Sequence, residues 1–149
     1  MKTALFVGSF DPFTIGHQAI VSRALPLFDR LVIGVGVNER KQTMFTAEER
    51  VEAIRQLYAH EERVSVASYT DLTIDLVSRE SATFIVKGVR SMKDFEYERE
   101  QSDINHRLSG IETILFFSSP ELSSVSSSMV RELIHFGHDV TPFLPVVHP

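Results

Sequence analysis

The stretch that decides the fold is Gly8-Ser9-Phe10-Asp11-Pro12-Phe13-Thr14-Ile15-Gly16-His17. It follows the apolar, strand-like run 4–7 and precedes a segment whose apolar residues recur at helical spacing: Ile20, Val21, Ala24, Leu25 and Phe28. A strand, a glycine-bearing turn and a helix therefore succeed one another. At such a junction the free N–H groups of the first helical turn and the helix dipole favour an anion. We expect a phosphate to bind there, with His17 offering a ring N–H donor.

The remaining chain repeats this alternation of strand and helix. The first strand is predicted at 4–7, and further strands at 31–37, 64–67, 83–86 and 113–117. Helices are predicted at 17–28, 47–59, 71–79, 94–108 and 127–136. Such alternation is typical of parallel strands with right-handed crossovers. We expect one α/β domain over residues 1–149, a Rossmann-like open sheet of five parallel strands with helices on both faces.

Specific residues mark two of the predicted helix boundaries. Thr46 and Glu49 have the spacing of a capping box, which predicts a helix start at Ala47. Pro26 is expected to end or kink the first helix near Leu25.

Composition narrows the class of protein. The formal charge of −5 argues against broad nucleic-acid binding, which normally shows a basic excess. Apolar runs stay far below the roughly 20 residues that span a bilayer, and the N-terminus does not resemble a signal peptide, so no membrane partner is expected. The sequence has no cysteine, which excludes disulfides, thiolate nucleophiles and zinc–cysteine sites and agrees with a cytoplasmic location.

The polar, glycine-bearing segments follow the predicted strands, at 8–17, 38–41, 69–73, 87–90 and 118–128. In open parallel sheets ligands bind beyond the carboxyl ends of the strands, so these segments should meet at one edge. Gly34-Val35-Gly36 is different, because it lies inside a strand and has no third glycine before a helix; it predicts close packing rather than a dinucleotide fingerprint.

Two of these segments are suited to phosphate. Lys87-Gly88-Val89-Arg90 places two cations around a glycine, although a solvated pair at a strand end would look the same. The run 123–128 is rich in serine, which is common in flexible linkers, but here it directly precedes a helix and supplies hydroxyl and amide groups to that helix start. A glycine-flanked serine elbow is absent from the sequence, which argues against a nucleophilic serine.

With these motifs in order, the chain resembles the bacterial phosphopantetheine adenylyltransferases, nucleotidyltransferases that carry a T/H-x-G-H motif. The matching segments are GSFDPFTIGH (8–17), Lys41 with MFTAEER (44–50), KGVR (87–90), DFEYE (94–98), SSVSSS (123–128) and FLP (143–145). The resemblance implies ATP and 4′-phosphopantetheine as substrates, dephospho-coenzyme A and pyrophosphate as products, magnesium, and a homohexamer.

The resemblance also assigns individual residues. His17, Lys41 and Arg90 are implied as catalytic, and ATP is assigned to Ser9, Phe10, His17, Gly88, Val89, Arg90, Glu98, Leu122, Ser123, Ser124, Val125, Ser126, Ser127 and Ser128. Phosphopantetheine is assigned to Ser9, Lys41, Thr73 and Lys87. The chain departs from the family at Lys87, where arginine is common, and it stops soon after FLP, where relatives often continue into a final helix.

The residue types in the sequence suit adenylyl transfer. A phosphate monoester has a second pKa of about 6 and is largely a dianion at neutral pH, so it needs no general base. Catalysis then consists of aligning two anions and stabilising the leaving pyrophosphate. Magnesium is expected to arrive on the ATP phosphates, because the sequence shows no aspartate cluster for a metal. Two alternatives stay open: a relative with another acceptor, such as nicotinamide mononucleotide or a glycerol phosphate cytidylyltransferase, and a non-catalytic nucleotide-binding regulatory module.

Overall fold

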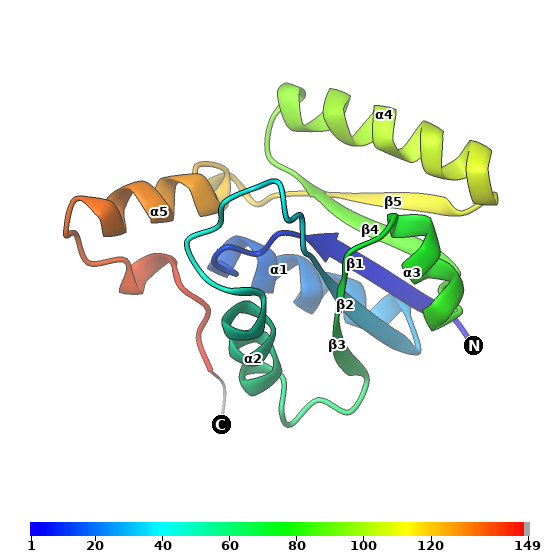
Figure 1. The fold of residues 1–149 in the computed structure, drawn as a ribbon, viewed down its shortest axis with the longest axis horizontal. Coiled ribbons are helices and arrows are strands. Elements are labelled where there is room, and N and C mark those ends of the chain that lie inside the picture. Colours follow the sequence, from blue (N-terminus) through cyan, green and yellow to red (C-terminus); the bar gives the residue numbers. More distant parts are fainter. Residues whose placement is uncertain (148–149) are drawn as a thin grey trace.

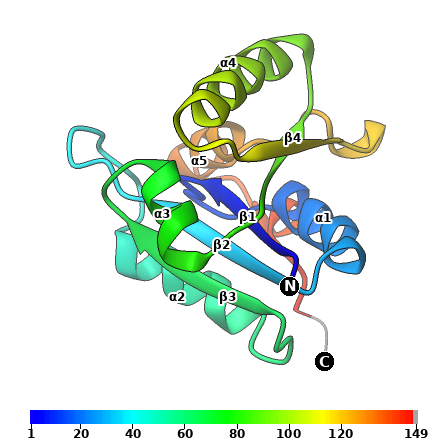
Figure 2. The ribbon, with the colours of Figure 1, turned by 90° about the vertical axis from the view of Figure 1, so that its right-hand side faces the viewer.

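The sheet is parallel and has the strand order β3-β2-β1-β4-β5 (Figures 1 and 2). The computed structural model describes residues 1–147. Its strands are β1 (Thr3–Gly8), β2 (Arg30–Gly36), β3 (Val64–Tyr69), β4 (Phe84–Val89) and β5 (Glu112–Phe117). The order reverses between β1 and β4, the point at which open α/β sheets bind ligands. The predicted fold class, an open sheet of five parallel strands, is confirmed.

Helices cover both faces of this sheet (Figure 2). They are α1 (Ile15–Ala24), α2 (Ala47–Leu57), α3 (Thr73–Glu80), α4 (Met92–Ser109) and α5 (Ser127–His135). Helices α1 and α2 pack on one face, α3 and α4 lie on the other, and α5 lies beyond the carboxyl ends of the strands (Figure 1). Across residues 1–147, every helix is too short or too polar to traverse a lipid bilayer.

Local sequence signals explain where helices begin and end. The Thr46 side chain accepts from the Glu49 N–H and the Glu49 side chain accepts from the Thr46 N–H, so the predicted capping box is confirmed. The first helix, predicted to reach Phe28, ends at Ala24. A 3₁₀ turn, Leu25–Leu27, follows it, because Pro26 cannot continue the α-helical hydrogen bonding.

The core has two halves because side chains alternate along each strand. Phe6 and Ile33 face α1 and α2, whereas Leu5 and Val32 face α3. Gly34 allows close packing on the α3 side, since a Cβ atom there would lie 2.7 Å from Leu76 Cδ2. The sequence prediction of close packing at Gly34 is therefore confirmed.

Strand β4 is longer than predicted. The sequence places its end at Val86, but pairing with β5 continues to Val89 opposite Phe117. Lys87, Gly88 and Val89 therefore belong to the strand, and Arg90 is the first residue beyond it.

The C-terminal segment returns to α1. The Gln18 side-chain amide donates to the Val146 carbonyl at 2.7 Å, and the Val146 N–H donates to the Gln18 amide oxygen at 3.0 Å. Gln18 is buried, so both halves of its amide are satisfied by the backbone of the tail. The tail therefore packs against the helix that carries His17.

Candidate active site

A long cleft lies at the carboxyl ends of the strands, in two adjoining parts. The His17 cavity has a volume of about 520 Å³ and lies between the β1–α1 turn and the segment before α5. The Thr73 cavity has a volume of about 780 Å³ and lies between the loop after β2, the start of α3 and the side of α4. Both are lined by Val7, Gly8, Ser9, Lys41, Lys87, Tyr97 and Glu98. The cleft is thus continuous and can hold two ligands side by side.

The turn between β1 and α1 is held by its own side chains. Thr14 caps α1, and His17, the third residue of the helix, completes a capping box with it. Phe10 has a φ of 50°, in the left-handed region that few residues with a Cβ adopt. Its side chain is buried against Phe6 and Phe13. Phe10 lines the His17 cavity, although only 3% of the residue is exposed.

His17 is a neutral hydrogen-bond donor. Its Nδ1 accepts from the Thr14 N–H at 2.9 Å, so the proton of the neutral ring resides on Nε2. Burial lowers the pKa of His17 from 6.5 to about 3, and the positive charges of Arg90 and Lys87 act in the same direction. The rings of Phe10 and Phe13 flank the imidazole at 5.0 and 5.2 Å. At neutral pH the ring can donate to an anion but holds no charge.

Lys87 stands where the two cavities meet. Its Nζ donates to the Val7 carbonyl at 3.2 Å and lies 3.1 Å from a carboxylate oxygen of Glu98. Glu98 comes from α4 and is only 7% exposed. Both charges face the cleft, so an incoming anion would meet a lysine that is already held in place. The neighbouring Gly88 also admits α1, because a Cβ there would lie 3.0 Å from Ile20.

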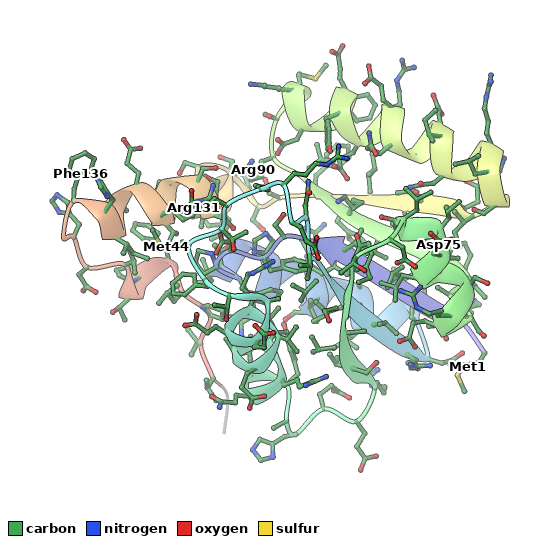
Figure 3. The ribbon with its side chains drawn as sticks, viewed as in Figure 1. Met1, Met44, Asp75, Arg90, Arg131 and Phe136 are labelled. Atoms are coloured by element: carbon green, nitrogen blue, oxygen red, sulfur yellow. The ribbon has the colours of Figure 1, made fainter. Side chains whose placement is uncertain are left out.

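Arg90 connects the end of β4 to the segment before α5. Its Nε lies 3.0 Å from Asp94 Oδ2, and its Nη1 donates to the Val125 carbonyl at 3.4 Å. Figure 3 shows Arg90, Arg131 and Met44 at the same end of the molecule, opposite Met1. Arg90 therefore lines the His17 cavity, next to both His17 and the serine segment, residues 122–128.

The serine segment forms one wall of the His17 cavity. Ser126 caps α5, since its hydroxyl accepts from the Met129 N–H at 3.1 Å, and the Ser127 hydroxyl donates to the Pro12 carbonyl at 2.7 Å. The residues of the segment that line the cavity are Leu122, Val125, Ser126, Ser127 and Ser128. Ser123 and Ser124, also assigned to ATP by the resemblance, are outside that lining; the Ser123 hydroxyl donates to the Pro120 carbonyl instead.

The other residues assigned by the resemblance also line the cleft. Ser9, Lys41 and Lys87 line both cavities, and Thr73 lines the cavity named after it, with its hydroxyl 3.1 Å from that of Tyr69. Gly88, Val89 and Glu98 line the His17 cavity.

Sequence reasoning missed several residues of the cleft. Tyr97, Gln101 and Asn105 project from α4 into the Thr73 cavity. Their spacing of four residues places them on one helix face, a signal that was present in the sequence. Asp11, which lies in the β1–α1 turn and lines the His17 cavity, was also missed, as was Arg50, which is buried behind that turn and bonds to the Ser9 carbonyl. Buried charges of this kind leave no periodic signal.

The groups that line the cleft are suited to polyanions. The cleft presents a neutral donor, a helix start with free amide groups, and the side chains of Lys41, Lys87 and Arg90. Within residues 1–147 no three histidine, aspartate or glutamate side chains are grouped so as to hold a metal ion.

The chain is similar to known proteins in sequence and in fold. Residues 5–133 match the family described as cytidylyltransferase-like. The sequence is 57% identical to the phosphopantetheine adenylyltransferase of Phocaeicola vulgatus over 97% of this chain and 96% of that protein. It is 53% identical to the enzyme of the same name from Bacteroides fragilis, over 97% of each chain.

A solved structure shares the fold. It is the bifunctional NMN adenylyltransferase/ADP ribose pyrophosphatase of Francisella tularensis, complexed with AMP and a manganese ion. The TM-score is 0.72 at 15% identity, over 99% of this chain and 45% of that one. At this identity the likeness concerns the fold.

Proposed function

Because the chain belongs to the family of the phosphopantetheine adenylyltransferases, we propose that it transfers the adenylyl group of ATP to 4′-phosphopantetheine. An oxygen of the phosphopantetheine phosphate attacks the α-phosphorus of ATP, and the bond from that phosphorus to the bridging oxygen breaks. The products are dephospho-coenzyme A and pyrophosphate, which carries away the electron pair. The observation that carries this proposal is the continuous cleft with His17 in one cavity and Lys41 and Lys87 at the junction.

We assign the His17 cavity to ATP. Ser9, the Phe10 backbone, Gly88, Val89, Arg90, Glu98 and the segment 122–128 would surround the nucleotide, and Ser123 and Ser124 would contribute only if the segment moves on binding. His17 would donate Nε2–H to the phosphate oxygens as charge develops on the leaving pyrophosphate. A neutral donor suits this task, since the N–H of a neutral imidazole is too weak an acid to give up its proton to the dianionic substrate.

We assign the Thr73 cavity to phosphopantetheine. Its phosphate would bind at the junction, between Ser9, Lys41 and Lys87, and its pantetheine arm would extend past Thr73. The positive charges of Lys41 and Lys87 would offset the repulsion between the phosphopantetheine phosphate and the ATP phosphates. This repulsion is greatest when the attacking phosphate approaches the α-phosphorus in line. His17, Lys41 and Arg90 are therefore the proposed catalytic residues.

Magnesium is the proposed metal, and it would enter on the ATP phosphates. The described residues provide single carboxylates around the cleft rather than a cluster, which fits a cation held chiefly by substrate oxygens and water. Bound in this way, magnesium would neutralise phosphate charge. The manganese ion of the Francisella structure supports the use of a divalent cation.

We further propose a cytoplasmic homohexamer. The absence of cysteine from the sequence agrees with that compartment. Exposed apolar side chains on α4 and β5 supply a surface for self-association: Ile104, Leu108 and Phe117 are 54%, 61% and 70% exposed. Sedimentation equilibrium should give six times the chain mass of 16.9 kDa; a monomeric mass would contradict the hexamer.

The function is tested by release of pyrophosphate. Purified protein is incubated with ATP and magnesium, and with 4′-phosphopantetheine or nicotinamide mononucleotide as acceptor; CTP with glycerol phosphate is the third reaction. Release with phosphopantetheine alone is expected. Release only with another acceptor would refute the proposed substrate, and no release in any reaction would favour a regulatory module.

The role of His17 is tested by His17→Ala, with the exposed His60→Ala as the matched control. Loss of one donor to developing charge should lower kcat about 10²- to 10³-fold and leave the KM for ATP within about threefold. An equal loss in both parameters would mean that His17 only binds ATP.

A further inference from the structure

Arg50 is a buried cation whose hydrogen bonds all go to backbone carbonyls. It lies on α2 and is 4% exposed. Its Nη1 donates to the carbonyls of Ser9 at 2.6 Å and Gly36 at 3.1 Å, and its Nε donates to that of Phe45 at 3.2 Å. These carbonyls belong to the turn after β1, the end of β2 and the segment before α2. One guanidinium therefore joins three separate segments.

Asp11 joins two of these segments again. Its carboxylate is 3% exposed and accepts from the N–H groups of Met44 and Phe45, both at 2.9 Å. The Asp11 carbonyl in turn accepts from Arg131 at 2.8 Å, which ties α5 to the same turn. The peptide around Phe45 is thus held from both sides, through its N–H by Asp11 and through its carbonyl by Arg50.

The loop fixed in this way is the one that carries Lys41. Residues 37–45 leave β2 at Gly36 and enter α2 after Thr46. Arg50 bonds to Gly36, directly before this loop, and to Phe45, its last residue. Asp11 bonds to its last two residues, Met44 and Phe45. The Lys41 side chain is exposed, and its backbone N–H bonds only within the loop, to Asn38 at 3.0 Å. Its place over the cleft depends on how the loop is anchored at both ends.

We propose that Arg50, together with Asp11, is a positioning residue that sets Lys41 at the junction of the two cavities. The pair fixes the distance between the β1–α1 turn, which carries Ser9 and leads into the first turn of α1 with His17, and the loop that carries Lys41. This inference rests on the proposed function, in which Lys41 binds the attacking phosphate. A lysine at position 50 has one nitrogen on a flexible stem and cannot bridge three carbonyls as the planar guanidinium does.

The test is Arg50→Lys, which keeps the charge, with Arg55→Lys as the matched control. Arg55 lies on the same helix, is exposed, and donates to Val66 on β3, far from the loop. Misplacement of a substrate-binding group by about 1 Å costs on the order of 10²-fold. We expect Arg50→Lys to lower kcat by about that factor and Arg55→Lys to leave it within about twofold.

A double-mutant cycle with Lys41→Ala separates positioning from general weakening. If Arg50 acts through Lys41, Arg50→Lys should lower kcat by less than about threefold in the Lys41→Ala background, because residues that act as a unit are not additive. The same large loss in both backgrounds would overturn the proposal.

Hydrogen exchange gives a readout that does not require activity. Arg50→Lys should accelerate exchange of the Met44 and Phe45 amides at least tenfold and leave the amides of β4 unchanged. Unchanged exchange at Met44 and Phe45 would overturn the inference even in an active enzyme. Accelerated exchange in Arg50→Lys, combined with a wild-type protein that releases no pyrophosphate, would instead place the failure with the proposed function.

Asp11→Asn provides a second variant in case Arg50→Lys does not fold. It keeps the shape of the side chain but turns one acceptor into a donor that faces an N–H group. We expect it to show the same dependence on Lys41. Additive losses with Lys41→Ala would count against the proposal as they do for Arg50.

Discussion

The neutrality of His17 predicts an acid-dependent loss of stability that can be assigned to this one residue. Its pKa falls from 6.5 to about 3 on folding, chiefly because the ring is buried. Between these values the unfolded chain binds more protons than the folded protein, so the free energy of unfolding decreases as the pH falls. Above about pH 6.5 His17 is neutral in both states and costs no stability. Below that value the free energy of unfolding falls progressively until about pH 3. The slope is at most about 1.4 kcal/mol per pH unit, and the loss between pH 6 and pH 5 is about 1 kcal/mol.

The matched variant is His17→Gln. Glutamine is a standard partner in the capping box, so its side-chain oxygen can still accept from the Thr14 N–H, but it does not titrate. Urea unfolding of both proteins at pH 5, 6 and 7 gives the free energies. The wild type should lose about 1 kcal/mol more than the variant between pH 6 and pH 5. An equal loss in both proteins would refute the reasoning, because it would mean that the folded protein protonates His17 as readily as the unfolded chain does.

Three further predictions follow from packing and charge. Lys87→Ala leaves Glu98 buried without its cation and should destabilise the protein by about 1–3 kcal/mol in urea unfolding; adding Glu98→Gln should restore most of that loss, and no recovery would show that the carboxylate is not the cause. Gly34→Ala places a Cβ 2.7 Å from Leu76 and should lower stability by about 1–3 kcal/mol, seen as a lower Tm; an unchanged Tm would show that Leu76 moves aside freely. Thr46→Ala removes the cap of α2 and should cost about 1 kcal/mol, whereas Thr46→Ser should be close to neutral; equal losses would exclude the hydroxyl as the source.

Much of the fold was predictable because burial leaves a periodic record in the sequence. The strands alternate faces and the helices repeat their apolar residues, so element order and sheet type follow from the pattern. The cap at Thr46 was also predictable, since Glu49 stands at the usual position. The equivalent cap at Thr14 was not, because its partner is His17 rather than glutamate or glutamine.

The end of β4 could not be predicted from local pattern. Lys87 and Gly88 are polar or small, and both favour a loop, yet the strand continues because β5 supplies a partner for each residue up to Val89. Tertiary pairing overrides local preference here.

The buried charges of Asp11 and Arg50 were beyond sequence reasoning for a related cause. Charged side chains are normally assigned to the surface. What keeps these two inside are backbone N–H and carbonyl groups more than thirty residues away, at Met44 and Ser9 respectively. Every residue offers the same backbone groups, so no residue type marks such a partner.

The contact between Gln18 and Val146 has a consequence for how the chain can diverge. Gln18 holds the tail through the main-chain atoms of Val146, as a neighbouring strand would, and the valine side chain takes no part in those two bonds. Replacement of Val146 by any residue other than proline, which lacks the N–H, thus leaves both bonds available. Removal of a residue upstream in the tail shifts the register and presents different main-chain groups to the buried amide. At this contact the residue type at position 146 can therefore vary during evolution, whereas the length of the tail is constrained.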